Sequence, residues 1–277
     1  MTRIRMILLS LLSVFAVSAV ASASASAVVF ECGKTEGHVE EGGDVALCKG
    51  TPYVEVGSPS EHAPVPFTSK KTAATTSKLE VTGGPTIVCT AATNTGEFDI
   101  SNGNIKDETG KSPDASDVYI TFTVCKITNT LETEAKCSVN SPGRADGTII
   151  VSGGKTGRIP PETSPDDGLD GILTGAGSAN PVPIQFAPSA TGEPFVVIEI
   201  GNKNGECPFT PGKFNVTGKQ KGKTENGIVK SCESAVVHKL VFPPTESELK
   251  FGSKEAKFEL TEDVELTSKE VWGLCPS

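Results

Sequence analysis

The feature that most constrains this fold is an alternation of apolar and other side chains from residue 118 to residue 125. The apolar positions are Val118, Ile120, Phe122 and Val124. Successive side chains of a strand point to opposite faces, so this spacing gives one apolar and one mixed face. β-Branched and aromatic residues dominate here, and they are typical of a pleated, half-buried surface. Because no apolar spacing of three and four is sustained, the pattern predicts antiparallel β-structure rather than a helix.

Two shorter strand patterns precede this one, at residues 87–90 and 97–100. Asn94-Thr95-Gly96 lies between them, and Asn and Gly tolerate turn conformations that other residues resist. The sequence therefore predicts a hairpin here. Further on, residues 195–200 form a nearly continuous apolar run, which predicts a central strand. A long final strand is predicted where Phe258, Leu260, Val264 and Leu266 share one parity, with Glu262 as the single misfit.

The first 27 residues are typical of an export signal. Arg3 and Arg5 precede an apolar run at residues 6–20, and Ala25-Ser26-Ala27 resembles a small-residue cleavage site. A membrane anchor is the alternative, but a span needs about 20 predominantly apolar residues and this run is shorter. We expect a free extracellular or cell-envelope protein with no membrane span in its mature chain.

The chain is acidic, with a formal net charge of −9, and loss of the signal would remove two arginines. Proteins that bind nucleic acids or anionic membranes neutralise phosphate with lysine and arginine. The charge therefore disfavours both partners and is better explained by solubility. The expected partner is an unidentified envelope or extracellular ligand.

All eight cysteines follow the signal. An even number of cysteines in an exported chain implies disulfide bonds, whereas metal binding is disfavoured because the chain has no CxxC pair and three histidines. We divide the chain into a signal peptide (residues 1–27), an N-terminal cystine-containing segment (28–66) and a β domain (67–277). Short strands with frequent turn signals predict an all-β fold, a disulfide-stapled antiparallel β-sandwich or open barrel with long Pro/Gly-rich loops.

No catalytic site is predicted. The serine in Gly175-Ala176-Gly177-Ser178-Ala179 lacks the nucleophile motif, and His238 shares strand parity with apolar neighbours, which indicates a packed structural histidine. Acidic residues are scattered, so spacing singles out no carboxylate pair. The sequence thus favours a non-enzymatic binding or structural protein. A secreted polysaccharide hydrolase with an unidentified carboxylate pair is the alternative.

No cofactor is predicted either. Asp166, Asp167 and Asp170 resemble part of a calcium loop, but Gly168 and Gly177 stand where that loop needs ligands. An acidic turn is favoured, and a looser calcium site that includes Glu162 is kept as the alternative.

Four segments resemble a family of secreted, β-rich, cysteine-containing actinobacterial proteins. They are IVCTAATNTGEF (87–98), ITFTVC (120–125), KCSVNSPGRADGTI (136–149) and PIQFAPSATGEPFVVIEI (183–200). The resemblance covers about residues 68–275 and implies an exported β domain, but no established activity and no functional residues. It also implies the cysteine pairs Cys125–Cys137 and Cys89–Cys207, which leave Cys232–Cys275 and Cys32–Cys48.

Overall fold

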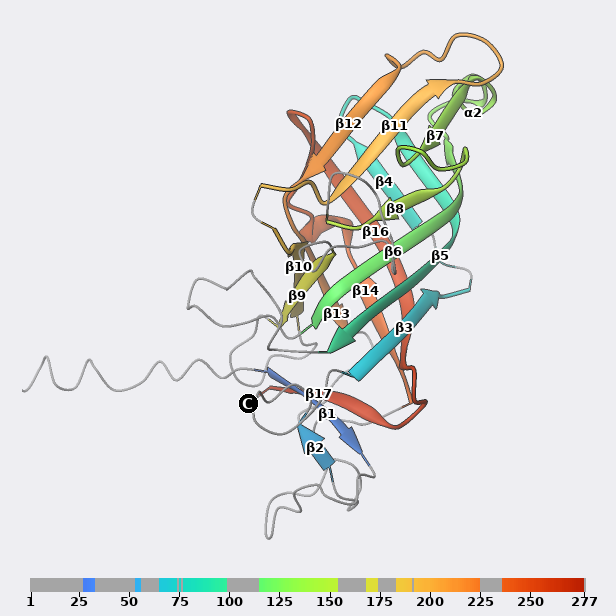
Figure 1. The fold of residues 1–277 in the computed structure, drawn as a ribbon. Helices are drawn as coiled ribbons and strands as arrows, with labels where there is room; N and C mark the ends of the chain where they lie inside the picture. Colours follow the sequence, from blue (N-terminus) through green and yellow to red (C-terminus); the bar gives the residue numbers. More distant parts are fainter. Residues whose placement is uncertain are drawn as a thin grey trace, which may run out of the picture.

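The computed structural model describes residues 27–32, 53–55, 65–73, 75, 77–98, 115–153, 168–173, 183–190, 192–224 and 236–276. Most of these residues lie in antiparallel strands, which confirms the predicted all-β fold (Figure 1). A small sheet has the strand order β17 (Trp272–Pro276), β1 (Ala27–Cys32) and β2 (Tyr53–Glu55). The other strands form one 14-stranded sheet.

Three long strands organise the large sheet, and each is 13 residues long. They are β5 (Thr86–Phe98), β6 (Ala115–Ile127) and β16 (Lys254–Leu266). Each of them pairs with different neighbours along its two halves. The sheet therefore returns on itself in two ring-like circuits that share these strands, which resembles the predicted open barrel more than a sandwich.

The first ring, as we call it, is completed by β3 (Val65–Lys71), β9 (Leu169–Leu173), β10 (Pro183–Pro188), β13 (Gln220–Thr224) and β14 (Val237–Phe242). The second ring is completed by β4 (Ser77–Val81), β8 (Ile149–Val151), β11 (Val196–Asn202), β12 (Gly212–Thr217) and β15 (Leu249–Phe251). Strand β7 (Cys137–Asn140) pairs with β11 outside this path.

The apolar core lies inside the rings. Along β16, every second residue is buried, as the sequence predicted from parity. Phe258 is the centre of an aromatic cluster, with ring centroids 5.9 Å from Phe122, 6.4 Å from Phe195 and 5.7 Å from Phe242. Burying one such side chain contributes roughly 1.5–3 kcal/mol, so the cluster stabilises the closure of both rings.

The inward face of β6 changes parity towards its C-terminal end, which corrects one prediction. Val118, Ile120 and Phe122 are buried, but Val124 is 57% exposed, with φ 54°, and Cys125 is buried instead. The neighbouring strand β5 changes parity at the same level of the sheet. Its buried residues Cys89 and Ala92 are separated by two exposed residues instead of one. Relative to strict alternation, each strand thus carries one extra residue at this level. Because both strands do so, the pairing register between them is the same on either side of it.

The predicted hairpin at Asn94-Thr95-Gly96 is wrong, because these residues lie inside the continuous strand β5. Pairing with β3 on one side and β6 on the other outweighs the local turn preference. Gly96 has a packing role instead. A Cβ at this position would lie 2.6 Å from Cζ of Phe67, so the absence of a side chain makes room for that ring.

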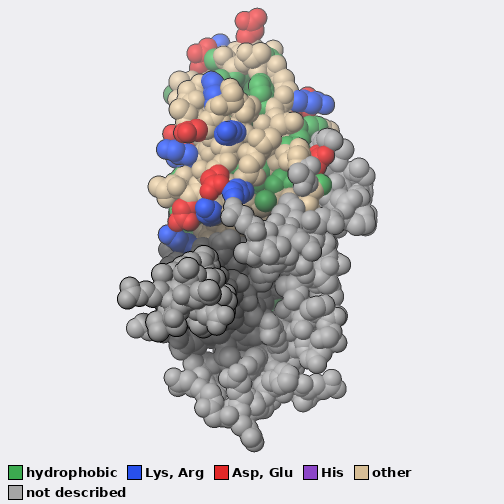
Figure 2. Space-filling view, turned by 90° about the vertical axis from the view of Figure 1, so that its left-hand side faces the viewer, with side chains coloured by type: hydrophobic (Ala, Val, Ile, Leu, Met, Phe, Trp, Pro, Cys, Tyr) green, Lys and Arg blue, Asp and Glu red, His purple; other side chains and the backbone are tan. Residues whose placement is uncertain are grey.

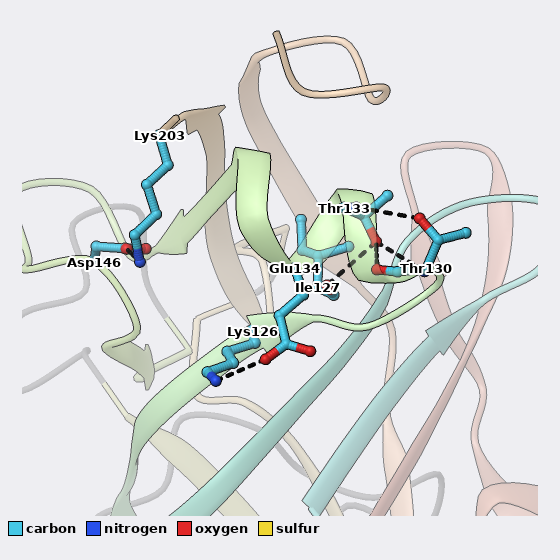
Figure 3. Close-up of polar contacts among 7 residues, drawn as sticks. All are labelled: Lys126, Ile127, Thr130, Thr133, Glu134, Asp146 and Lys203. Atoms are coloured by element: carbon cyan, nitrogen blue, oxygen red, sulfur yellow. Dashed lines mark hydrogen bonds and ion pairs between the residues drawn. The ribbon is translucent and has the colours of Figure 1, made fainter. Parts of the chain in front are cut away.

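A short helix, α2 (Leu131–Lys136), connects β6 to β7 and was not predicted. Six residues are too few for a helix to be stable alone, so its caps matter. Thr133 N donates to Thr130 Oγ1 at 3.1 Å, and Thr130 N donates to Thr133 Oγ1 at 2.9 Å (Figure 3). Glu134 also pairs with Lys126 at 2.7 Å, and nearby Lys203 pairs with Asp146 at 2.7 Å.

Two disulfides are described, Cys89–Cys125 and Cys137–Cys207, so the predicted pairs Cys89–Cys207 and Cys125–Cys137 are wrong. Cys89 and Cys125 are direct partners on β5 and β6, with Cα atoms 4.0 Å apart. Cys137 opens β7 opposite the end of β11, 4.8 Å from Cys207 between Cα atoms. Strand pairing rather than sequence spacing thus selects these partners. The pairs Cys32–Cys48 and Cys232–Cys275 involve Cys48 and Cys232, which lie outside the described residues.

The small sheet joins the two ends of the described chain. Strand β1 pairs with β17, so the predicted N-terminal segment shares a sheet with the last strand. The boundary predicted between residues 66 and 67 falls inside β3. Residues 1–26 of the predicted signal peptide lie outside the described part.

Candidate functional site

A pocket of about 310 Å³ opens at one end of the second ring, where three connections meet. The β4–β5 turn, the β11–β12 loop and the β15–β16 turn each contribute residues to it. Strands β4, β11 and β12 reach this part of the molecule in the upper half of Figure 1. The pocket is thus built from segments that are far apart in the sequence.

The wall and floor of this pocket are apolar. Phe214 on β12 stacks on Phe251 on β15, with ring centroids 4.8 Å apart and an interplanar angle of 26°. Phe251 is buried, whereas Phe214 and Phe209 are only partly buried. Val81 and Ile200 complete the floor. Stacked aromatic pairs contribute about 0.5–1.5 kcal/mol beyond area burial, so the wall is preformed.

The rim of the pocket is polar and is held in place by two turns. Gly252 and Ser253 connect the paired residues Phe251 and Lys254, and Gly252 takes the left-handed φ of 61° that a two-residue hairpin connection requires. Lys254 Nζ donates to the carbonyl oxygen of Gly83 at 2.6 Å, in the β4–β5 turn. Lys254 lines the pocket, and this hydrogen bond restrains its side chain.

Sequence reasoning missed these residues. Gly-Ser between two segments of alternating apolar and charged residues is a hairpin signal and could have located the β15–β16 turn. The pocket itself has no sequence signal, because Phe209, Phe214 and Lys254 meet only when the second ring closes.

A second, larger groove of about 890 Å³ is lined by residues of β12, β15, β16 and the 3-10 helix η2 (Pro244–Glu246). Its lining contains two carboxylates, Glu248 and Glu255. The hydrolase alternative, which requires an accessible pair of carboxyl groups, can therefore be examined at this groove. The hydrogen bond from Lys221, with Lys219 nearby, lowers the pKa of Glu248 below its ordinary value. A glycosidase acid needs a raised pKa, so Glu248 is unsuited to that role.

Glu262 is an acid with a strongly perturbed pKa, and it lies inside the first ring. Its side chain is fully buried, and burial raises its pKa to about 7. Ser69 Oγ donates to Glu262 Oε2 at 2.9 Å, and Asn94 Nδ2 donates to the same oxygen at 3.3 Å. A polymeric substrate cannot reach a carboxyl group in the core, so this group is structural rather than catalytic.

The predicted calcium residues are described in part. Asp170 is buried in β9, not in an exposed turn, and its Oδ1 accepts a hydrogen bond from Ser189 Oγ at 2.7 Å. Asp166, Asp167 and Glu162 lie outside the described residues. Among the residues with described positions, no three His, Cys, Asp or Glu side chains cluster in a way that could hold a metal ion. The calcium site stays a prediction.

His238 is buried on β14, as its parity predicted. Its Nε2 lies 2.8 Å from the carbonyl oxygen of Trp272, and the two rings meet edge to face at 4.5 Å between centroids. Since a carbonyl oxygen only accepts, Nε2 is the protonated nitrogen in this contact. The pair connects the first ring to the small sheet.

Charged side chains of both signs are interspersed on the face shown in Figure 2, within the part of the chain that is described. Within the same residues, no helix has the length and apolar character needed to cross a membrane. Comparison of the chain with models of protein families, with curated proteins and with solved structures finds no match. The resemblance to secreted actinobacterial proteins therefore stays a prediction.

Proposed function

We propose that this chain is an exported, non-enzymatic binding protein of the cell envelope or the extracellular medium, and that the pocket at the end of the second ring binds its ligand. The observation that carries the proposal is the partly exposed Phe214 stacked on Phe251 beside an open pocket. Ligand sites typically enclose about 300–1,000 Å³, with mostly apolar walls and a few polar groups. This pocket matches that description at its lower limit.

The pocket's size favours a small apolar group as ligand. An apolar cavity of about 150 Å³ is enough for a benzene ring, so about 310 Å³ has room for a ring with a short chain. The partly exposed aromatic surface of Phe209 and Phe214 would be removed from water when such a group binds. Burial of apolar area would then supply most of the binding free energy.

Export is supported by the disulfides and by the predicted signal. Disulfides persist in oxidising compartments outside the cytosol, and two are described in this chain. The basic and apolar N-terminal segment agrees with the same location. Both observations support the proposed location independently of the pocket.

The hydrolase alternative receives less support. Glycoside hydrolysis needs two carboxyl groups about 5–10 Å apart at an accessible site, one of them protonated. Glu262 has a raised pKa but is buried, and Glu248 is accessible but has a lowered pKa. Neither residue combines the two requirements.

The proposal is tested by ligand-observed NMR on the oxidised mature protein with 4-phenylbutanol, a neutral probe. We expect saturation transfer to the phenyl protons, and loss of most of it in Phe214→Ala. Val237→Ala, which truncates an exposed apolar side chain outside the pocket, is the matched control and should leave the transfer unchanged. Transfer that is absent in the parent protein, or equal in parent and Phe214→Ala proteins that are both folded by circular dichroism, would overturn the proposal.

A further inference from the structure

We infer that the natural ligand of this pocket is a small organic anion, with an apolar body in the pocket and one acidic group at Lys254. The inference rests on the proposed function and specifies its ligand class. It is carried by the polar groups of the rim.

The rim presents hydrogen-bond donors and one positive charge. The polar side chains that line the pocket are Thr210, Ser253 and Lys254. Among the described lining residues there is no Asp or Glu, although the chain has 34 acidic and 25 basic residues. Lys254 is the charged residue among them, so the described lining carries one positive charge and no negative charge. Such an arrangement favours an anion locally.

Lys254 is held in position with unused binding capacity. One of its three N–H donors is directed to the carbonyl oxygen of Gly83, which restrains the flexible side chain. Within the described part of the chain it forms no ion pair, whereas Lys219 and Lys221 both pair with Glu248. Because an ammonium group cannot accept a hydrogen bond, its remaining donors are suited to a ligand oxygen that carries negative charge.

The polar and apolar parts of the site are separated in the way an amphipathic anion requires. Val81, Ile200 and Phe251 form a buried floor, and Lys254 and Ser253 are exposed at the mouth. A carboxylate at the rim stays in contact with water, so the desolvation penalty of a buried ion pair is avoided. Exposed ion pairs contribute about 0.2–1 kcal/mol, which corresponds to a preference of up to about fivefold.

The test compares three probes that share one apolar body: 4-phenylbutyrate, 4-phenylbutanol and 4-phenylbutylamine. Titration calorimetry at low salt should give the order butyrate, then butanol, then butylamine, with butyrate bound about threefold to fivefold more tightly than the alcohol. Lys254→Met should remove this preference, so that butyrate and the alcohol bind to the variant with equal affinity. Lys250→Met, at an exposed lysine of β15 that faces the groove, is the matched control and should keep it.

The outcomes separate the inference from the proposed function. If the alcohol binds as tightly as butyrate, or if Lys254→Met keeps the preference, the anionic ligand is refuted while the apolar pocket stands. If all three probes bind and Phe214→Ala weakens none of them, or if none binds, the proposed site itself is refuted. A preference lost equally in Lys250→Met and Lys254→Met would show a general effect of net charge and would also refute the role of Lys254.

Discussion

Ser69 donates a hydrogen bond of 2.9 Å to the carboxyl group of Glu262, although the two residues are 193 positions apart in the sequence. Asn94 donates to the same oxygen, so side chains from β3, β5 and β16 converge inside the first ring. The other oxygen, Glu262 Oε1, has no hydrogen-bond partner among the described residues. Burial opposes ionisation here more strongly than the two donors favour it, and the pKa of Glu262 rises to about 7.

This relationship predicts that the protein loses stability between about pH 4.5 and pH 7. In that window the folded protein keeps the proton on Glu262, whose ordinary pKa is 4.5, while the unfolded chain releases it. The unfolded state therefore binds fewer protons, and the free energy of unfolding falls as the pH rises through the folded pKa, by about 3 kcal/mol in total. Urea denaturation at a series of pH values measures how steeply the free energy of unfolding falls with pH.

Glu262→Gln is the variant that isolates this effect. A glutamine keeps an oxygen that accepts hydrogen bonds from Ser69 and Asn94, but it does not titrate. Between pH 4.5 and pH 7, the free energy of unfolding should therefore fall less steeply with pH, by the amount that corresponds to about one proton. Glu259→Gln, at a half-buried position on the opposite face of the same strand, should keep the slope of the parent protein. An identical slope in the Glu262→Gln and parent proteins would contradict the assignment.

Removing a donor to Glu262 should destabilise the protein more at high pH than at low pH. Ser69→Ala leaves a buried carboxylate with one donor fewer, and an unsatisfied buried group costs about 1–3 kcal/mol. At pH 5 the carboxyl group is protonated and the loss should be smaller. A double-mutant cycle of Ser69→Ala with Glu262→Gln at pH 5 and pH 8 measures the coupling, and a coupling that does not change with pH would disprove the prediction.

The disulfide pairing predicts the result of non-reducing peptide mapping. Peptides that contain Cys89 and Cys125 should be recovered as one species, and those with Cys137 and Cys207 as another. The bridged residues are 36 and 70 positions apart, so removing either bridge by double alanine substitution should destabilise the protein by about 4 kcal/mol in the chain-entropy model. Recovery of Cys125 joined to Cys137 would contradict this pairing.

Gly96→Ala should destabilise the first ring by about 1–3 kcal/mol, because it overfills a packed site. The new methyl group would meet the buried Phe67 ring at 2.6 Å and Val118 Cγ2 at 3.0 Å. Phe67→Leu should relieve part of the clash, so the double variant should be more stable than the sum of the single changes predicts. Thr95→Ala, at the adjacent exposed position, is the control for strand propensity. Additive losses would show that the ring and the methyl group do not meet.

The strands with a clear parity were predictable because side-chain alternation is local. Phe258, Leu260, Val264 and Leu266 are buried on one face of β16, and His238 is packed as its neighbours indicated. The errors have a common origin in strand pairing. The apolar face does not continue to Val124, because β5 and β6 each contain an extra residue at that level, and the predicted turn at Asn94-Thr95-Gly96 is extended because strands pair on both of its sides.

The sequence by itself determined the all-β class, the approximate position of several strands and the presence of disulfides, because these follow from side-chain alternation, turn residues and cysteine number. Only the tertiary structure decided how the strands close into two rings, which cysteines pair, what surrounds Glu262 and where Lys254 meets Phe214. These features depend on contacts between residues far apart in the chain. Their geometry is set by the pairing of β5, β6 and β16 with all their neighbours, and no local pattern encodes it.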